Sequence, residues 1–207
     1  MWTMTGPDPA NDPSDRDAYM SAVTVGARRR VDGPITLVDY DPRWPGLYER
    51  EAARVRELLG DRVRLLEHVG STSVPGLPAK PIIDMVLAVA DSADEPAYVP
   101  SMEAGGYHVR IREPDWHGHR VFKGPDTDVN LHTFSDGSSE IVRMLAFRDR
   151  LRTHDGERER YLETKRELAA RHWVYIQDYA DAKGEVVEAI IAQALAEAAE
   201  AAETGSR

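Results

Sequence analysis

The sequence contains no cysteine, which excludes disulfide bonds, cysteine-ligated zinc and thiol catalysis. It also lacks any apolar run close to the roughly 18 residues that a membrane-spanning helix needs. Residues 1–17 do not show the basic segment followed by an apolar segment that marks a signal peptide. We therefore expect a cytoplasmic protein without a membrane partner.

The sequence also has fewer basic than acidic residues. The 26 Lys and Arg residues face 36 Asp and Glu residues, which gives a net charge of −10 at pH 7. Nucleic-acid binding depends on clustered basic residues, so we expect no nucleic-acid partner. The overall charge does not exclude a local basic pocket for one small phosphorylated ligand.

The 207 residues, 42% of them apolar and 30% charged, are typical of one globular domain. Residues 1–33 are rich in Pro, Asp, Gly and Ser with little periodicity, and this predicts a disordered lead. Residues 34–196 are expected to form the folded domain. Residues 197–207 end an Ala/Glu-rich helical tail that we expect to fray.

Periodicity predicts an α+β fold, with a small mixed sheet of about five strands and helices packed against it. Asp41 and Pro42 are typical of an N-cap and a first helical position, and the helix they begin ends at Gly60. The other predicted helices cover residues 95–104, 140–152, 157–172 and about 178–200. The predicted strands cover residues 64–69, 82–89, 107–111, 120–123 and 129–134, after a short extended segment at 34–38.

The most informative segment, residues 68–86, reads HVGSTSVPGLPAKPIIDMV. A Gly70-Ser71 turn offers backbone N–H groups and a hydroxyl to phosphates, and Asp84 in the next strand could hold Mg²⁺. Strands of this kind normally carry two acids at i and i+2, but Val86 occupies the second position. The other candidates for this site are Thr72, Ser73 and Lys80 for phosphate and Asn130, with Asp128, for the metal.

Two histidines are candidate bases for this chemistry, namely His68 before the turn and His132 in the strand 129–134. If the strands that carry Asp84 and His132 pair, His132 and Asn130 face the same side as Asp84. The alternatives are structural: Asp84 could pair with Lys80 or a histidine, and His68 could be a hydrogen-bonded residue at a sheet end. For His117 and His119 we expect structural or solvent-facing roles.

Three cations fall on the apolar faces of the last three predicted helices. Arg148, Lys165 and Lys183 each lie in line with the buried stripe of their helix. Each head could reach water or an acid such as Asp149 or Glu167, because long basic side chains can lie along a core. Three together favour a shared anion pocket.

These residues resemble the GrpB family, and the resemblance covers about residues 35–192. It rests on 68–77 and 80–84, on Leu131-His132, on 147–152, on Tyr161 with Lys165, and on Tyr179 with 181–183. The resemblance implies a nucleotidyltransferase fold of the DNA polymerase β type. Some members are fused to dephospho-coenzyme A kinase, which implies association with such a metabolic enzyme.

Three functions follow as expectations. The first is a nucleotidyltransferase-like enzyme, with a nucleotide over the turn, Mg²⁺ on Asp84, and basic residues and Tyr161 around the phosphates. The second is a non-catalytic protein that binds a nucleotide or coenzyme A-like ligand and has lost the second acid at Val86. The third is metal-free acid–base or ligase-like chemistry by Asp84 with His68 or His132.

Overall fold

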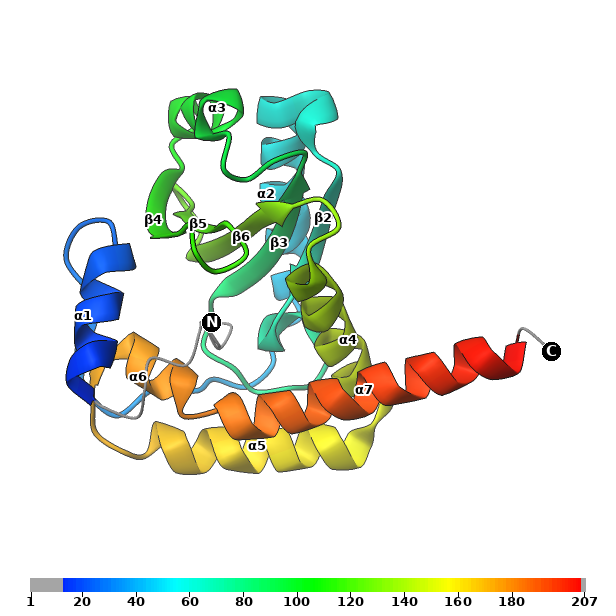
Figure 1. Ribbon diagram of the computed structural model, residues 1–207. Coiled ribbons are helices and arrows are strands. Elements are labelled where there is room, and N and C mark those ends of the chain that lie inside the picture. The colour runs from blue at the N-terminus through cyan, green and yellow to red at the C-terminus, as the bar shows by residue number, and fades with distance from the viewer. Residues whose placement is uncertain (1–12, 206–207) are drawn as a thin grey trace.

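A computed structural model describes residues 13–205 of the chain (Figure 1). Its centre is a mixed five-stranded sheet in the order β2-β3-β6-β5-β4, which confirms the predicted α+β architecture. All pairs are antiparallel except β3 with β6, which run parallel. The strands are β2 (Leu65–Val69), β3 (Ile83–Val89), β4 (His108–Glu113), β5 (His119–Lys123) and β6 (Val129–Ser135).

Helices cover both faces of this sheet. Those of at least six residues are α1 (Pro13–Val23), α2 (Trp44–Leu59), α3 (Val99–Ala104), α4 (Ser139–Thr153), α5 (Asp155–Ala169), α6 (Ile176–Asp181) and α7 (Gly184–Gly205). Short 3₁₀ turns lie at Gly60–Arg62, Ser71–Ser73 and Glu95–Ala97. A second, two-stranded sheet pairs β1 (Arg30–Gly33) with β7 (Trp173–Tyr175).

Strand β3 is buried along its whole length, as its almost continuous apolar run predicts. Ile83, Met85 and Leu87 belong to the core beneath α2 and α3, whereas Val86 and Ala88 belong to the core beneath α4 and α7. Because strand side chains alternate between faces, Asp84 lies on the α4 and α7 side. Figure 1 shows α5 and α7 side by side below the sheet, with α4 between them and β3.

The described part of the N-terminal segment, residues 13–33, contains regular structure where disorder was expected. Residues 13–23 form α1, whose Met20 and Val23 pack on Ile111 and Val121 of the sheet. Residues 30–33 form β1. Helix α1 and strand β1 are stabilised by distant segments of the chain, so the hydrophobic periodicity of the sequence does not reveal them. Residues 1–12 lie outside the described residues.

Three predicted helices have different ends. Helix α2 starts at Trp44, since Asp41 accepts the Arg43 backbone N–H at 2.9 Å and stabilises the turn before the helix. Helix α5 ends at Ala169, and β7 follows where helix was expected to continue to residue 172. The single last helix is two helices, α6 and α7, with Lys183 in the break between them. The expected frayed tail continues α7 to Gly205.

Among residues 13–205, no helix combines the length and apolar character that a membrane crossing requires.

Candidate functional site

A small pocket lies where the 71–73 turn, the start of β3, α5 and the break before α7 meet. Its volume is about 20 Å³, against roughly 10–15 Å³ for one water molecule measured the same way. Its polar lining consists of Ser71, Thr72, Lys80, Asp84, Lys165, Tyr179 and Lys183. We call it the lysine pocket, because the chain has only four lysines and three of them line it.

Lys165 enters this pocket from α5 and is 2% exposed. Its Nζ donates to the Pro78 carbonyl oxygen at 2.5 Å and to Ser71 Oγ at 3.2 Å. Burial, with Lys183 and Lys80 as neighbours, lowers the pKa of Lys165 from 10.5 to about 6. No carboxylate is among its hydrogen-bond partners in the described residues, so the cost of a buried charge is not offset there.

Lys80 and Tyr179 each have a polar atom without a hydrogen-bond partner in the described part of the chain. Both Lys80 Nζ and the Tyr179 hydroxyl are buried and unpartnered among the described residues. The Tyr179 ring lies 4.9 Å from Lys80 Nζ and 5.3 Å from Lys183 Nζ. Burial and the charge of Lys183 lower the pKa of Lys80 to about 7, and burial raises the pKa of Tyr179. The sequence marks Tyr179 only through the family resemblance.

Tyr161 lies next to residues that line the pocket. Its hydroxyl lies 3.4 Å from Ser71 Oγ, and its ring faces Lys165 Nζ at 4.9 Å and Lys183 Nζ at 6.0 Å. The structure therefore brings Ser71, Lys80, Tyr161, Lys165 and Lys183 together, as the sequence predicts. The aromatic faces of Tyr161 and Tyr179 partly offset the desolvation of the ammonium groups.

The Gly70-Ser71 turn supports Asp84 rather than presenting an open phosphate loop. Gly70 has a φ of +68°, and a Cβ there would lie 2.6 Å from Asp84 Oδ2. Thr72 Oγ1 donates to the Ile82 carbonyl oxygen at 3.1 Å, and Ser73 Oγ donates to the Gly70 carbonyl oxygen at 2.6 Å. The hydroxyls of Thr72 and Ser73 thus hold the turn closed, whereas Ser71 faces the pocket.

Asp84 lies beside Asn130, which confirms the strand pairing considered from the sequence. Asn130 Nδ2 donates to Asp84 Oδ1 at 2.7 Å, and Asn130 Oδ1 accepts from Lys123 Nζ at 2.7 Å. An ammonium group can only donate and a carboxylate can only accept, so this orientation of the amide is required. The oxygen of Asn130 therefore faces away from Asp84.

The side chains around Asp84 do not fit Mg²⁺, which prefers several oxygen ligands in octahedral geometry. Asp84 offers one carboxylate beside three lysines, Val86 offers none, and Asp128 accepts from Lys123 at 2.6 Å. Within the described chain, no three His, Asp or Glu side chains are placed to hold a metal ion together. The magnesium site stays a prediction without support from this geometry.

His68 lies on the opposite face of the sheet from Asp84. It is opposite Met85 in the β2–β3 register and stacks on Tyr48 of α2, with ring centroids 4.9 Å apart. Its Nε2 lies 3.0 Å from Thr72 Oγ1, and burial lowers the pKa of His68 to about 4. This placement matches the structural alternative for His68.

Arg148 is also outside the lysine pocket. It donates to Glu67 at 2.8 Å, to Asp149 at 2.7 Å and to the His68 carbonyl oxygen at 3.1 Å. Glu67 lies opposite Val86 in the sheet, so the sheet does carry a second acid on this face, on β2. Arg148 engages that acid, which explains why this cation does not join the lysines.

A profile of the GrpB protein family matches residues 34–193. The chain belongs to the GrpB family. A UPF0157 protein of Halalkalibacterium halodurans is 56% identical over 187 residues, which cover 90% of this chain and 96% of that protein. The crystal structure of the conserved protein GrpB from Enterococcus faecalis has 33% identity and a TM-score of 0.69, and covers 78% of this chain and 98% of that one.

A dephospho-CoA kinase of Mycolicibacterium paratuberculosis is 29% identical over 176 residues, which cover 72% of this chain and 43% of the kinase. GrpB-like sequence therefore occurs within a longer protein of that name. The nucleotidyltransferase character of the fold stays a prediction.

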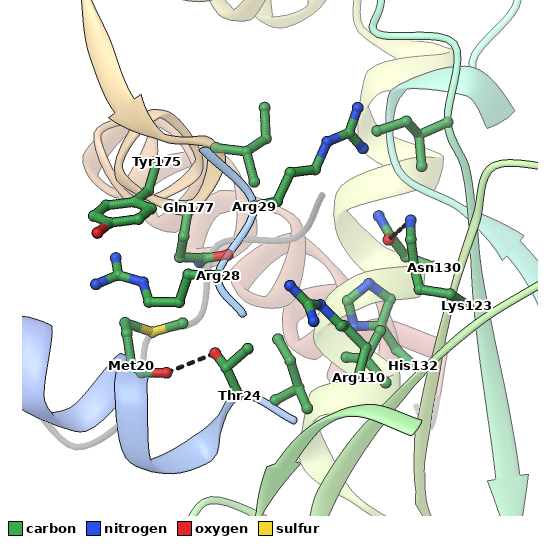
Figure 2. Close-up of a pocket in the computed structure, with 14 residues that line it drawn as sticks. Met20, Thr24, Arg28, Arg29, Arg110, Lys123, Asn130, His132, Tyr175 and Gln177 are labelled. Atoms are coloured by element: carbon green, nitrogen blue, oxygen red, sulfur yellow. Dashed lines mark hydrogen bonds between the residues drawn. The ribbon is translucent and has the colours of Figure 1, made fainter. Parts of the chain in front are cut away.

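His132, the third candidate catalytic residue, lies one row further along the same sheet face, opposite Val86. It is 2% exposed and lines a second pocket of about 70 Å³ (Figure 2). We call this the arginine pocket, because Arg28, Arg29 and Arg110 line it together with Lys123. Ile82 lines both pockets, and the Lys123–Asn130–Asp84 chain of hydrogen bonds leads from one to the other.

We expect Gly70→Ala to destabilise the protein by about 1–3 kcal/mol, because a strained backbone and the contact with Asp84 act together. Gly76→Ala is the matched control. Gly76 also has a positive φ, +77°, but its Cβ would meet nothing within 4 Å. Chemical denaturation of both variants measures the difference. Equal losses would show that room for the Asp84 carboxylate is not why glycine is needed at position 70.

Proposed function

We propose that the lysine pocket binds a phosphoryl group of a small phosphorylated molecule, such as a nucleotide or coenzyme A-like ligand. The observation that carries the proposal is the meeting of three lysines in one buried pocket. Two polar atoms there, Lys80 Nζ and the Tyr179 hydroxyl, have no hydrogen-bond partner in the described chain. A phosphate oxygen accepts from both and reduces the repulsion between the ammonium groups.

The charges favour an anion over a metal ion. Three ammonium groups against the single carboxylate of Asp84 give the pocket a positive balance when all are ionised. Such groups at low dielectric attract an anion more strongly than they would in water. The pocket volume of about 20 Å³ holds little more than one water-sized group, so one phosphate oxygen fits inside and the rest of the ligand would lie outside.

The same arrangement supports binding more than metal-dependent nucleotidyl transfer. Asp84 faces Asn130 Nδ2 and Gly70, and no second acid stands beside it on β3. Association with a kinase of coenzyme A synthesis would give such binding a metabolic setting. The similarity to the mycobacterial kinase supports this part of the proposal only by analogy.

Thermal unfolding with inorganic pyrophosphate, ADP or dephospho-coenzyme A, each in EDTA and in Mg²⁺, tests the proposal. A ligand at a hundredfold its Kd adds about 2.7 kcal/mol of stability. We expect pyrophosphate to raise Tm equally in both buffers. Absence of a shift with every probe would contradict binding. Pyrophosphate release from nucleoside triphosphates only with Mg²⁺ would instead support the transferase and contradict a metal-free binder.

Lys80→Met should stabilise the empty protein by about 1–3 kcal/mol at pH 6, since it removes buried positive charge and no described hydrogen bond. The same variant should weaken pyrophosphate binding by about 10-fold to 100-fold, the loss of one charge-assisted hydrogen bond. Denaturation and calorimetry measure the two effects. Arg148→Gln is the control, because Arg148 is paired with Glu67 and Asp149. An equal loss of affinity in that control would contradict the assignment of the pocket.

Binding should also weaken as pH rises. The lowered pKa values of Lys80, about 7, and Lys165, about 6, mean that both lose protons near neutrality. Between these values and the ordinary lysine pKa, the folded state holds fewer protons than the unfolded chain, so the empty protein gains stability as pH rises.

Sulfate is the probe for this effect because its own charge is constant near neutral pH. We expect its affinity to fall roughly tenfold per pH unit above pH 7 for each proton taken up on binding. Calorimetry in buffers of different ionisation enthalpy measures that uptake. Affinity that is flat with pH, together with no proton uptake, would contradict the role of these two amines.

A further inference from the structure

We infer that the arginine pocket is a second ligand site, in which Glu113 and His119 fix His132 so that its Nε2 accepts a hydrogen bond from a hydroxyl of a small organic anion. The inference does not depend on the lysine pocket. It rests on a chain of buried hydrogen bonds and on two atoms, Arg28 Nη2 and His132 Nε2, that have no hydrogen-bond partner among the described residues.

The chain runs across three neighbouring strands. Glu113 of β4 accepts from the Tyr19 hydroxyl at 2.5 Å and lies 2.7 Å from His119 Nδ1 on β5. His119 Nε2 lies 3.0 Å from His132 Nδ1 on β6. Glu113, His119 and His132 are each at most 2% exposed, and the two imidazole rings stack with 4° between their planes.

These contacts determine the tautomers when both rings are neutral. The Glu113 carboxylate can only accept, so His119 carries its proton on Nδ1 and its Nε2 is an acceptor. His132 must then donate from Nδ1 to His119. The remaining nitrogen, His132 Nε2, holds a lone pair and has no partner in the described chain. This is the order in which a carboxylate fixes the tautomer of a catalytic or metal-binding histidine.

The pocket beyond His132 is cationic. Four of its fourteen lining residues are Arg or Lys, and none is Asp or Glu. Arg28 stacks on Tyr175 at 3.7 Å and its Nη1 donates to Asp17 at 2.7 Å. Its Nη2, 3.6 Å from Asp178, is buried without a hydrogen bond in the described chain. Figure 2 shows Arg28 beside Tyr175 and, across the pocket, His132.

Arg28 Nη2, a donor, and His132 Nε2, an acceptor, have no hydrogen-bond partner among the described residues, and together they indicate the ligand class. An anionic oxygen satisfies Arg28, and a hydroxyl hydrogen satisfies His132 Nε2. Arg28, Arg29 and Lys123 are paired with Asp17, Asp178 and Asp128. An amine would still meet Arg110, which donates only to backbone carbonyl oxygens among the described residues. The volume of about 70 Å³ suits a compact molecule, which makes a small hydroxy acid the matching class.

Long-range ¹H–¹⁵N spectra of the full chain labelled at histidine test the tautomer, with His132→Gln to assign the signals. We expect the Nδ1–H form of His132 in the wild type and in Glu113→Gln, whose side-chain oxygen still accepts. Glu113→Leu should lose the single tautomer. A wild-type His132 that carries its proton on Nε2 would overturn the inference, even if Glu113→Leu fails to fold.

Pairs of acids that differ in their hydroxyl groups test the proposed ligand class. We expect malate and glycerate to shift the His132 Nε2 signal. Succinate and propionate, which are the same two acids without their hydroxyl groups, should bind about tenfold more weakly or worse. The shift should persist in Lys80→Met, which separates this site from the lysine pocket. Equal binding of hydroxy and deoxy acids, or no shift of His132 with any of them, would overturn the second site.

Discussion

The parallel pairing of β3 with β6 determines where the polar groups of this GrpB-family protein meet. It places Asn130 beside Asp84 and His132 beside Val86 on one face of the sheet. The antiparallel neighbours extend the row of Val86 and His132 to Glu67 on β2 and Val121 on β5. A shift of one residue would move all of these side chains to the face covered by α2, because strand side chains alternate. The register is held by the apolar residues of β3 on both faces.

Asp84 is therefore best understood through its neighbours rather than as half of a metal site. Its carboxylate receives Asn130, abuts Gly70 and faces a pocket of lysines. A carboxylate in this position balances part of the buried positive charge and keeps the amide of Asn130 oriented. The two pockets share this feature, since Lys123 completes the same chain of hydrogen bonds at the arginine pocket.

Much of this arrangement could be predicted from the sequence, because it depends on local pattern. The apolar run of β3, the alternation in β6 and the lysine at a buried helix position are visible without coordinates. The exposure of Lys165, 2%, agrees with its place in the apolar stripe of α5. The sequence does not show α1, whose few apolar residues form a core only with β4 and β5.

The remaining differences come from pairings between distant residues. The face on which His68 lies depends on the β2–β3 register, and the pairing of Arg148 depends on Glu67, 81 residues away. The chain from Glu113 through His119 to His132 is likewise assembled from three strands. Each of these residues is ordinary in its local segment. Its role follows from a partner that periodicity does not identify.

The scarcity of lysine has a chemical consequence of its own. Burial lowers the pKa of Lys165 to about 6, so this amine gives up its proton more readily than an exposed lysine does. The only lysine outside the lysine pocket, Lys123, is held by Asp128 and Asn130. The protein therefore gathers three of its four side-chain amines, Lys165 among them, in one cavity.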